Sequence, residues 1–157
     1  MPKILSYKEP IMKDQELSEI IGTAYQSNGM VEMLAKAGYS DIAIQYYMQK
    51  PYMGALADAD QVSEMTGTCG DTMAVYLKVN DNVVDDVRYE VMGCAGAVSA
   101  AMAAVDLVKG KTIEEARRLA DGDVFRVLQE IPVKKHHCIQ LAVKALHKTI
   151  DEYQQKK

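Results

Sequence analysis

The stretch T-M-A-V-Y-L-K-V-N-D-N-V-V-D-D-V-R-Y-E-V, residues 72–91, alternates apolar and polar side chains over most of its length. Successive side chains of a β-strand point to opposite faces of the sheet, so this alternation predicts strands with one buried face. The N-D-N segment at 80–82 is typical of a turn. The stretch therefore predicts an antiparallel hairpin. Two registers keep its apolar faces matched: Val75 opposite Tyr89, or Val75 opposite Val87.

Helical patterns occupy most of the remaining chain. Apolar residues at helical spacing, together with Ser, Gly and Pro at the segment ends, predict helices on both sides of the hairpin. The predicted helices cover 14–26, 30–36, 41–49, 97–108, 112–119, 123–129 and 137–153. Residues 52–68 are expected to be mostly loop, with a third strand within 58–68. The predicted fold class is α+β, with a small antiparallel sheet of about three strands covered on one face by helices.

The N-terminal segment is expected to be separable from the rest. Residues 1–38 are interpreted as an N-terminal helical extension, and residues 39–157 as the main domain. The extension contains neither cysteine nor histidine. We expect it to form a helical cap on this domain or on a sister subunit, or else an element for partner docking or oligomerisation.

Length and charge limit the classes of protein that are plausible. The chain has 157 residues, enough for one domain with a substantial core. Its net charge of −4 argues against bulk nucleic-acid binding, which usually requires a basic surface. It contains no apolar run of about 20 residues and no secretory signal pattern. We therefore expect a cytoplasmic protein with neither a nucleic-acid nor a membrane partner.

Three cysteines, Cys69, Cys94 and Cys138, carry most of the chemical information. An odd number in a chain of this kind argues against a disulfide framework. Buried, inert thiols are one interpretation. However, all three cysteines fall at the ends of predicted elements. Cys138 also follows the basic run V-K-K-H-H (133–137) at the start of a helix, a setting that favours the thiolate over the thiol.

The predicted topology brings further metal-binding groups to these thiols. Either hairpin register places Cys69 and Cys94 at the same end of the sheet, and Cys138 begins the core-facing stripe of the last helix. Asp71 and His137 are close in sequence to two of the cysteines. The candidate ligand set is Cys69, Asp71, Cys94, His137 and Cys138. Such a set suits zinc or an iron–sulfur cluster, and its surplus over four ligands without C-x-x-C spacing indicates exchange rather than permanent retention.

Four stretches carry a family resemblance. They are C-G-D-T-M (69–73), G-C-A-G-A (93–97), V-K-G-K-T-I-E-E-A (108–116) and K-H-H-C-I-Q-L-A (135–142). Together they closely resemble the IscU/NifU-type iron–sulfur cluster assembly scaffolds, and the resemblance covers roughly residues 39–153. It implies a scaffold, not an enzyme, on which Fe²⁺, sulfide and electrons combine into a [2Fe-2S] cluster. It also implies that the family's cluster ligands fall on Cys69, Cys94 and Cys138, joined by Asp71 and His137.

The resemblance also implies partners and roles. Sulfur would arrive as a persulfide from a cysteine desulfurase, with Cys138 as first acceptor, Lys135 assisting and Asp71 keeping the cluster labile. The cluster would then pass to apo iron–sulfur proteins or carriers. The segment I-P-V-K-K (131–135) lacks one proline of the bacterial chaperone-recognition motif Leu-Pro-Pro-Val-Lys, which weakens the expectation of an Hsp70-type partner. A homo-oligomer is compatible with the resemblance.

Two rival functions stay open at the level of sequence. The first is a structural or regulatory zinc-binding module that holds Zn²⁺ with the same ligands. The second is a thiol enzyme with Cys138 as nucleophile, His137 as base and Asp71 as the group that orients the base. The enzyme hypothesis gives no role to Cys69 or Cys94, whereas the scaffold hypothesis uses all three thiols.

Overall fold

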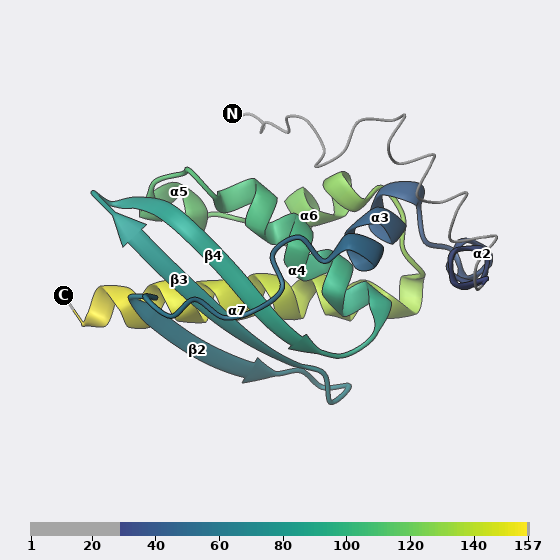
Figure 1. The fold of residues 1–157 in the computed structure, drawn as a ribbon, viewed down its shortest axis with the longest axis horizontal. Helices are drawn as coiled ribbons and strands as arrows, with labels where there is room; N and C mark the ends of the chain where they lie inside the picture. The colour runs from purple at the N-terminus through teal and green to yellow at the C-terminus, as the bar shows by residue number, and fades with distance from the viewer. Residues whose placement is uncertain (1–28, 157) are drawn as a thin grey trace.

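The computed structural model describes residues 29–156, so the predicted helix at 14–26 and most of the 1–38 extension lie outside the described residues. Its centre is a three-stranded antiparallel sheet in the order β2-β3-β4 (Figure 1). The strands are β2 (Gln61–Thr66), β3 (Thr72–Asn80) and β4 (Val83–Met92). The predicted hairpin and third strand are both confirmed.

The hairpin adopts the first of the two predicted registers. Val75 lies opposite Tyr89, and the pairing continues in register from Leu77 down to Thr72, which lies opposite Met92. The two turn residues at 81 and 82 have positive φ angles of 54° and 63°. Positive φ at both central positions gives the tight turn whose twist matches that of the flanking strands.

Helices cover one face of the sheet. They are α2 (Met30–Ala37), α3 (Asp41–Gln49), α4 (Ala95–Val108), α5 (Ile113–Arg117), α6 (Asp121–Leu128), the 3₁₀ turn η1 (Val133–Lys135) and α7 (His136–Gln155). Helix α7 packs on β2 and β3 while α4 packs on β4, and α3 and α6 contact α4 in turn (Figure 1). The α+β prediction is confirmed. In the described part of the chain, no helix is both long and apolar enough to span a bilayer.

Helix α4 is the centre of the core. Nearly all of its side chains are buried, and most of these are small, with alanine the commonest residue. Small side chains let neighbouring helices approach the α4 axis closely. The inward residues of β3 and β4, including Met73, Leu77 and Val87, are fully buried beneath the helices. The Tyr89 hydroxyl donates to the Ala142 carbonyl at 2.8 Å and ties the sheet to α7.

The outer edge of β4 is covered by a segment that we expected to be loop. Tyr89 donates its N–H to the Tyr52 carbonyl at 3.0 Å, and its own carbonyl accepts from the Gly54 N–H at 2.9 Å. Residues 52–54 therefore run parallel to β4, with a bridge between Met53 and Tyr89. Periodicity did not predict this contact because the paired segment is only a few residues long.

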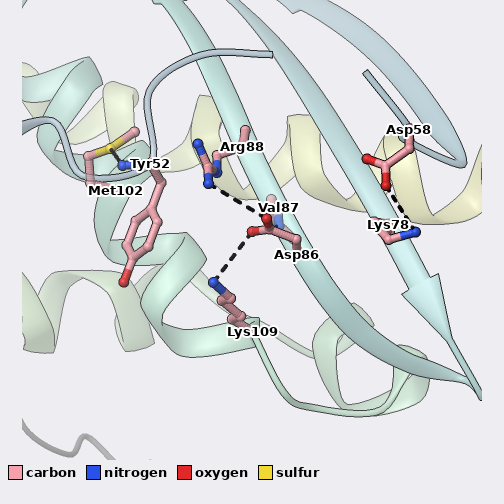
Figure 2. Close-up of polar contacts among 8 residues, drawn as sticks. All are labelled: Tyr52, Asp58, Lys78, Asp86, Val87, Arg88, Met102 and Lys109. Atoms are coloured by element: carbon pink, nitrogen blue, oxygen red, sulfur yellow. Dashed lines mark hydrogen bonds and ion pairs between the residues drawn. The ribbon is translucent and has the colours of Figure 1, made fainter. Parts of the chain in front are cut away.

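A polar network lies beside this edge, at the C-terminal end of α4. Figure 2 shows Asp86 paired with Arg88 at 3.7 Å and with Lys109 at 3.5 Å. In the same view the Tyr52 N–H donates to the Met102 sulfur at 3.2 Å. The hydroxyl groups of Tyr46 and Tyr52 both donate hydrogen bonds to the carboxylate of Asp106. We call these groups the α4 C-terminal network; they are Tyr46, Tyr52, Asp86, Arg88, Asp106 and Lys109.

Candidate metal centre

Three predicted ligands meet at one end of the molecule. Cys94 caps the N-terminus of α4 directly after β4, Asp71 precedes β3, and Cys138 lies in the first turn of α7. One carboxylate oxygen of Asp71 and the two sulfurs all lie within 4.8 Å of one another. The Cys94 and Cys138 sulfurs are 3.6 Å apart, and Asp71 Oδ2 lies 3.8 Å from Cys94 Sγ and 4.0 Å from Cys138 Sγ. We call this group the ligand triad.

Two glycines allow the triad to close. A Cβ atom on Gly93 would lie 2.7 Å from the Asp71 carboxyl carbon, a distance that side chains do not tolerate. A Cβ atom on Gly96 would lie 3.2 Å from Lys135 Cβ and 3.6 Å from Cys138 Sγ. Gly93 therefore lets the Asp71 carboxylate lie against the backbone beside Cys94, and Gly96 lets α4 begin close to Lys135. The G-C-A-G pattern was a signal of this close approach.

His137 and Lys135 lie next to the triad rather than within it. The Nε2 atom of the half-buried His137 is 3.7 Å from Cys138 Sγ, so the imidazole touches one triad member. Lys135 precedes α7 and packs beside Gly96 at the start of α4, where its positive charge helps to stabilise a thiolate on Cys94. Their predicted proximity to the site is confirmed, whereas their roles stay predictions.

Cys69 does not join the close group. The ladder stops at Thr72 opposite Met92, and the chain then turns, with the Gly67 N–H donating to the Asp71 carbonyl at 2.8 Å. Gly70 takes a φ of +93° in this turn. Cys69 lies at the same end of the sheet as Cys94, as predicted, but it is exposed and its sulfur lies outside the triad. Its charge still contributes to raising the pKa of Cys138. Its role as a ligand stays a prediction.

The two close thiols divide their charge in the opposite sense to our expectation. A hydrogen bond from Cys138 is the main cause that lowers the pKa of Cys94 to about 5, with burial opposing it and the Ala97 N–H and Lys135 assisting. The same hydrogen bond, with burial and the charge of Cys94, raises the pKa of Cys138. These two directions favour a thiolate on Cys94, whereas the sequence predicts one on Cys138, and the activation of Cys138 stays a prediction.

Tyr39 is a neighbour of the site that the sequence did not indicate. Its hydroxyl would lie 3.4 Å from a Cβ atom on Gly96, on the side that faces Cys138. Burial is the main cause that raises the pKa of Tyr39 to about 12, and the negative charges of Cys94 and Cys138 add to it. Tyr39 therefore presents a neutral hydroxyl to the thiols. It lies 30 residues before Cys69, so no local pattern linked it to them.

The fold and the site together define a family. Residues 38–157 match the family model described as the NifU-like N terminal domain, and the chain belongs to this family. It is 37% identical over 116 residues to the iron-sulfur cluster assembly scaffold protein IscU 1 of Archaeoglobus fulgidus, a match that covers 73% of this chain and 76% of the relative. It is 33% identical over 124 residues to the IscU scaffold protein of Escherichia coli strain K12, covering 76% and 96%.

Solved structures agree with this assignment. A nitrogen-fixing NifU-like protein (N-terminal) from Brucella abortus is 25% identical, with a TM-score of 0.62, and the match covers 73% of this chain and 93% of that one. A putative iron-sulfur cluster assembly scaffold for the SUF system from Fervidobacterium islandicum is 22% identical with a TM-score of 0.62, covering 71% and 96%, and supports the fold. The resemblance to IscU/NifU-type scaffolds is confirmed.

Proposed function

We propose that this scaffold assembles [2Fe-2S] clusters from iron and from persulfide sulfur delivered by a cysteine desulfurase, and then passes them to apo-proteins or carriers. The observation that supports this most is the ligand triad, in which two thiols and one carboxylate from three separate elements meet within 4.8 Å. Thiolates bind iron–sulfur clusters firmly, and the half-buried setting leaves the site within reach of partners.

The mixed donor set supports transient rather than permanent holding. Carboxylate oxygen is a harder ligand than thiolate and a poorer match for the iron of a cluster. Asp71 is therefore the weak member of the triad and the point at which an incoming thiol from an acceptor protein displaces a ligand. His137, 3.7 Å from Cys138, and the exposed Cys69 are the nearest additional ligands.

The remaining roles follow from position. Cys138 stores the sulfane sulfur, and Lys135 assists by holding a positive charge beside Cys94. Residues 39–157 carry the scaffold function, because residues 1–38 contain no cysteine or histidine, and the extension serves packing or partner binding. Within the I-P-V-K-K segment Ile131 is buried and Val133 is 82% exposed, so Val133 is the apolar group available to an Hsp70-type chaperone. The cytoplasm is the proposed compartment.

The thiol-enzyme alternative has less support than the scaffold. A catalytic triad needs its carboxylate against the imidazole, so that the acid orients the base. Asp71 instead lies against the sulfurs of Cys94 and Cys138, and no hydrogen bond joins it to His137 among the described residues. The zinc-module alternative uses the same donors, since thiolates and imidazole also suit Zn²⁺, and chemical analysis has to separate it from the scaffold.

Anaerobic reconstitution tests the proposal. The full chain is incubated with ferrous iron, cysteine and a cysteine desulfurase, desalted, and analysed for iron, acid-labile sulfide and zinc, with visible circular dichroism to report an ordered cluster. We expect iron and sulfide in equal amounts together with a visible dichroic signal. Retention of zinc with no acid-labile sulfide would favour the zinc module instead.

A further inference from the structure

The end of the molecule that holds the ligand triad also carries most of the exposed large apolar side chains. Four such side chains are exposed in the part of the chain that the structure describes, and three of them lie in segments next to the metal centre. Met92 comes two residues before Cys94, Val133 comes two residues before Lys135, and Met33 lies on α2. Each of the three is between 63% and 82% exposed. We call these three residues the apolar rim.

Contacts between segments place the apolar rim around the metal centre. A Cβ atom on Gly38, which ends α2, would lie 3.7 Å from Pro132 Cγ, and a Cβ atom on Gly96, at the start of α4, would lie 3.2 Å from Lys135 Cβ. Residues 132–135, which include one rim residue, therefore lie between α2 and the start of α4. Figure 1 shows α2 at the end of the molecule where β4 finishes and α7 begins.

The surface beside the apolar rim is positively charged. Lys134 is exposed and Lys135 is half-buried, and neither lysine forms an ion pair with a carboxylate of the described residues. Two histidines, His136 and His137, follow directly. Exposed apolar side chains beside unpaired cations match the chemistry of an amphipathic helix that carries carboxylates on its polar side. The surface therefore fits an acidic, amphipathic partner.

The N-terminal extension contains a segment of this chemistry. Residues 14–26 lie outside the described residues, but their sequence places four apolar side chains at the spacing of one helix face, namely Leu17, Ile20, Ile21 and Ala24. The segment has no lysine or arginine, and its carboxylates are Asp14, Glu16 and Glu19. The described chain starts at Gly29, directly before α2. A connection from residue 26 to residue 29 spans at most about 10 Å, which keeps the segment close to the rim.

We propose that residues 14–26 dock on the apolar rim as an amphipathic helix and cover the approach to the metal centre. The apolar stripe of the helix would bury the rim side chains, and its carboxylates would meet Lys134 and Lys135. A short tether gives the segment an effective concentration on the order of millimolar, which favours it over a second copy of the chain at lower concentration. The inference does not depend on which metal or cluster the centre holds.

Docking would give the extension a regulatory role. A docked helix covers Val133, the apolar group available to an Hsp70-type chaperone, so the helix and the chaperone exclude each other. The helix would also shield the ligand triad from solvent until a partner arrives. Release of the helix, rather than a change in the core of the domain, would then open the metal centre.

Site-specific photo-crosslinking of the full-length, metal-free chain tests the docking. p-Benzoylphenylalanine replaces Val133 in one protein and, as the matched control, Val62, the exposed apolar residue on β2. After irradiation, monomeric protein is recovered from a denaturing gel and digested with trypsin, which separates residues 14–36 from residues 127–134. Fragment spectra then locate the crosslink. We expect crosslinks from position 133 to residues 14–26, at a yield about fivefold or more above that from position 62, because a docked segment stays beside the rim.

Substitutions separate docking from proximity alone. Ile21→Asp should lower the yield from position 133 by about tenfold, because an unpaired carboxylate is costly to bury against apolar side chains. Gln15→Asp adds the same charge on the opposite face of the helix and should leave the yield unchanged. Lys134→Glu should lower the yield several-fold by repelling the acidic segment, whereas Lys144→Glu, at an exposed position further along α7, should not.

Four results would overturn the proposal. Crosslinks that join two chains would make a second copy the occupant, and an absence of crosslinks to residues 14–26 would leave the rim to an external partner. Equal yields from positions 133 and 62, or from Ile21→Asp and Gln15→Asp, would mean that the segment does not dock. Leu17→Asp, on the same stripe, provides a second variant. The proposed function fails separately, since it is measured by iron and acid-labile sulfide rather than by crosslinking of metal-free protein.

Discussion

The two ends of helix α4 differ in whether the polar groups that meet there attract or repel one another. At its C-terminal end, the hydroxyl groups of Tyr46 and Tyr52 donate to the carboxylate of Asp106. Arg88 and Lys109 form ion pairs with Asp86 in the same region (Figure 2). At its N-terminal end, the groups that meet are two thiols and a carboxylate, which repel one another when ionised. Helix α4 therefore has one end whose polar groups complete each other and one end whose groups need a proton or a metal ion between them.

Because of this difference, we expect one end of α4 to affect the stability of the fold and the other end to affect metal binding. Contacts in the α4 C-terminal network should contribute to the free energy of unfolding and leave metal affinity alone. Changes in the ligand triad should lower metal affinity without lowering the free energy of unfolding. Removing one triad member should even relieve electrostatic repulsion in the metal-free protein. Substitutions at each end of α4 test whether the two ends are independent.

The largest expected effect is on the ionisation of Cys94. We expect its alkylation by iodoacetamide to be nearly independent of pH from neutrality down to about pH 6, and then to slow as the pH falls through its pKa of about 5. An ordinary cysteine would already slow below its pKa of about 8.5. Peptide mapping of limited alkylation in metal-free protein measures this, with glutathione as the reference thiol. Faster alkylation of Cys138 than of Cys94 would instead support the sequence-based prediction that Cys138 is the activated thiolate.

Loss of a triad thiol should have the next largest effect. Cys94→Ser should weaken Zn²⁺ binding by about 100-fold. Loss of a group that only supports a metal ligand costs about 10- to 100-fold in affinity, and loss of the ligand itself should cost at least as much. Competition with a chromophoric chelator measures the affinity. Asp106→Asn is the matched control at the other end of α4 and should bind Zn²⁺ like the wild type. An affinity of Cys94→Ser within about threefold of the wild type would show that the triad is not the metal site.

Gly93→Ala tests the close approach without removing a ligand. Gly93 does not have a positive φ, so alanine adds no backbone strain there and its methyl group acts by displacing the Asp71 carboxylate. We expect Zn²⁺ affinity to fall by about tenfold, as for loss of a supporting group at a metal site. Gly122→Ala is the control, because the added Cβ would meet only Arg126 Nη1, at an ordinary 3.8 Å. Equal effects of the two substitutions would mean that Gly93 has no special role.

Asp71→Ala should change transfer more than assembly. Removing the weak carboxylate leaves Cys94 and Cys138 in place and His137 beside them, so we expect a longer-lived cluster that passes several-fold more slowly to an apo-ferredoxin. Visible circular dichroism of the two proteins under anaerobic conditions follows the exchange. If Asp71 only supports the turn before β3, the variant will be less stable and will transfer its cluster at the wild-type rate.

The smallest expected effect lies at the far end of α4. Asp106→Ala removes the acceptor of two tyrosine hydroxyl groups and should lower the free energy of unfolding by about 1 kcal/mol, because the site is partly open to water. Urea denaturation measures the change, and Zn²⁺ affinity measured in parallel should stay constant. A fall in metal affinity in the folded variant would show that the two ends are coupled through the helix.

Periodicity and element boundaries predicted much of this molecule. The alternation in 72–91 limited the hairpin to two registers, and the positions of Cys94 and Cys138 at helix starts predicted that they would meet. The displacement of Cys69 was not predictable, because it depends on a turn with Gly70 at positive φ rather than on a continued ladder. The lowered pKa of Cys94 was also not predicted, since it depends first on a hydrogen bond with Cys138 and then on the Ala97 N–H and Lys135, which only the folded chain brings together.

The alanine-rich interior of α4 also has an evolutionary consequence. Adding methylene groups to a well-packed core typically costs about 1–3 kcal/mol, and almost every side chain of this helix is enclosed by other elements. Tolerated drift should therefore accumulate on the solvent-facing positions of β2 and β3, while α4 accepts little beyond exchanges among small residues. Divergent members of the family would then be recognised more reliably by a run of small residues after the second cysteine than by the strands that determine the fold.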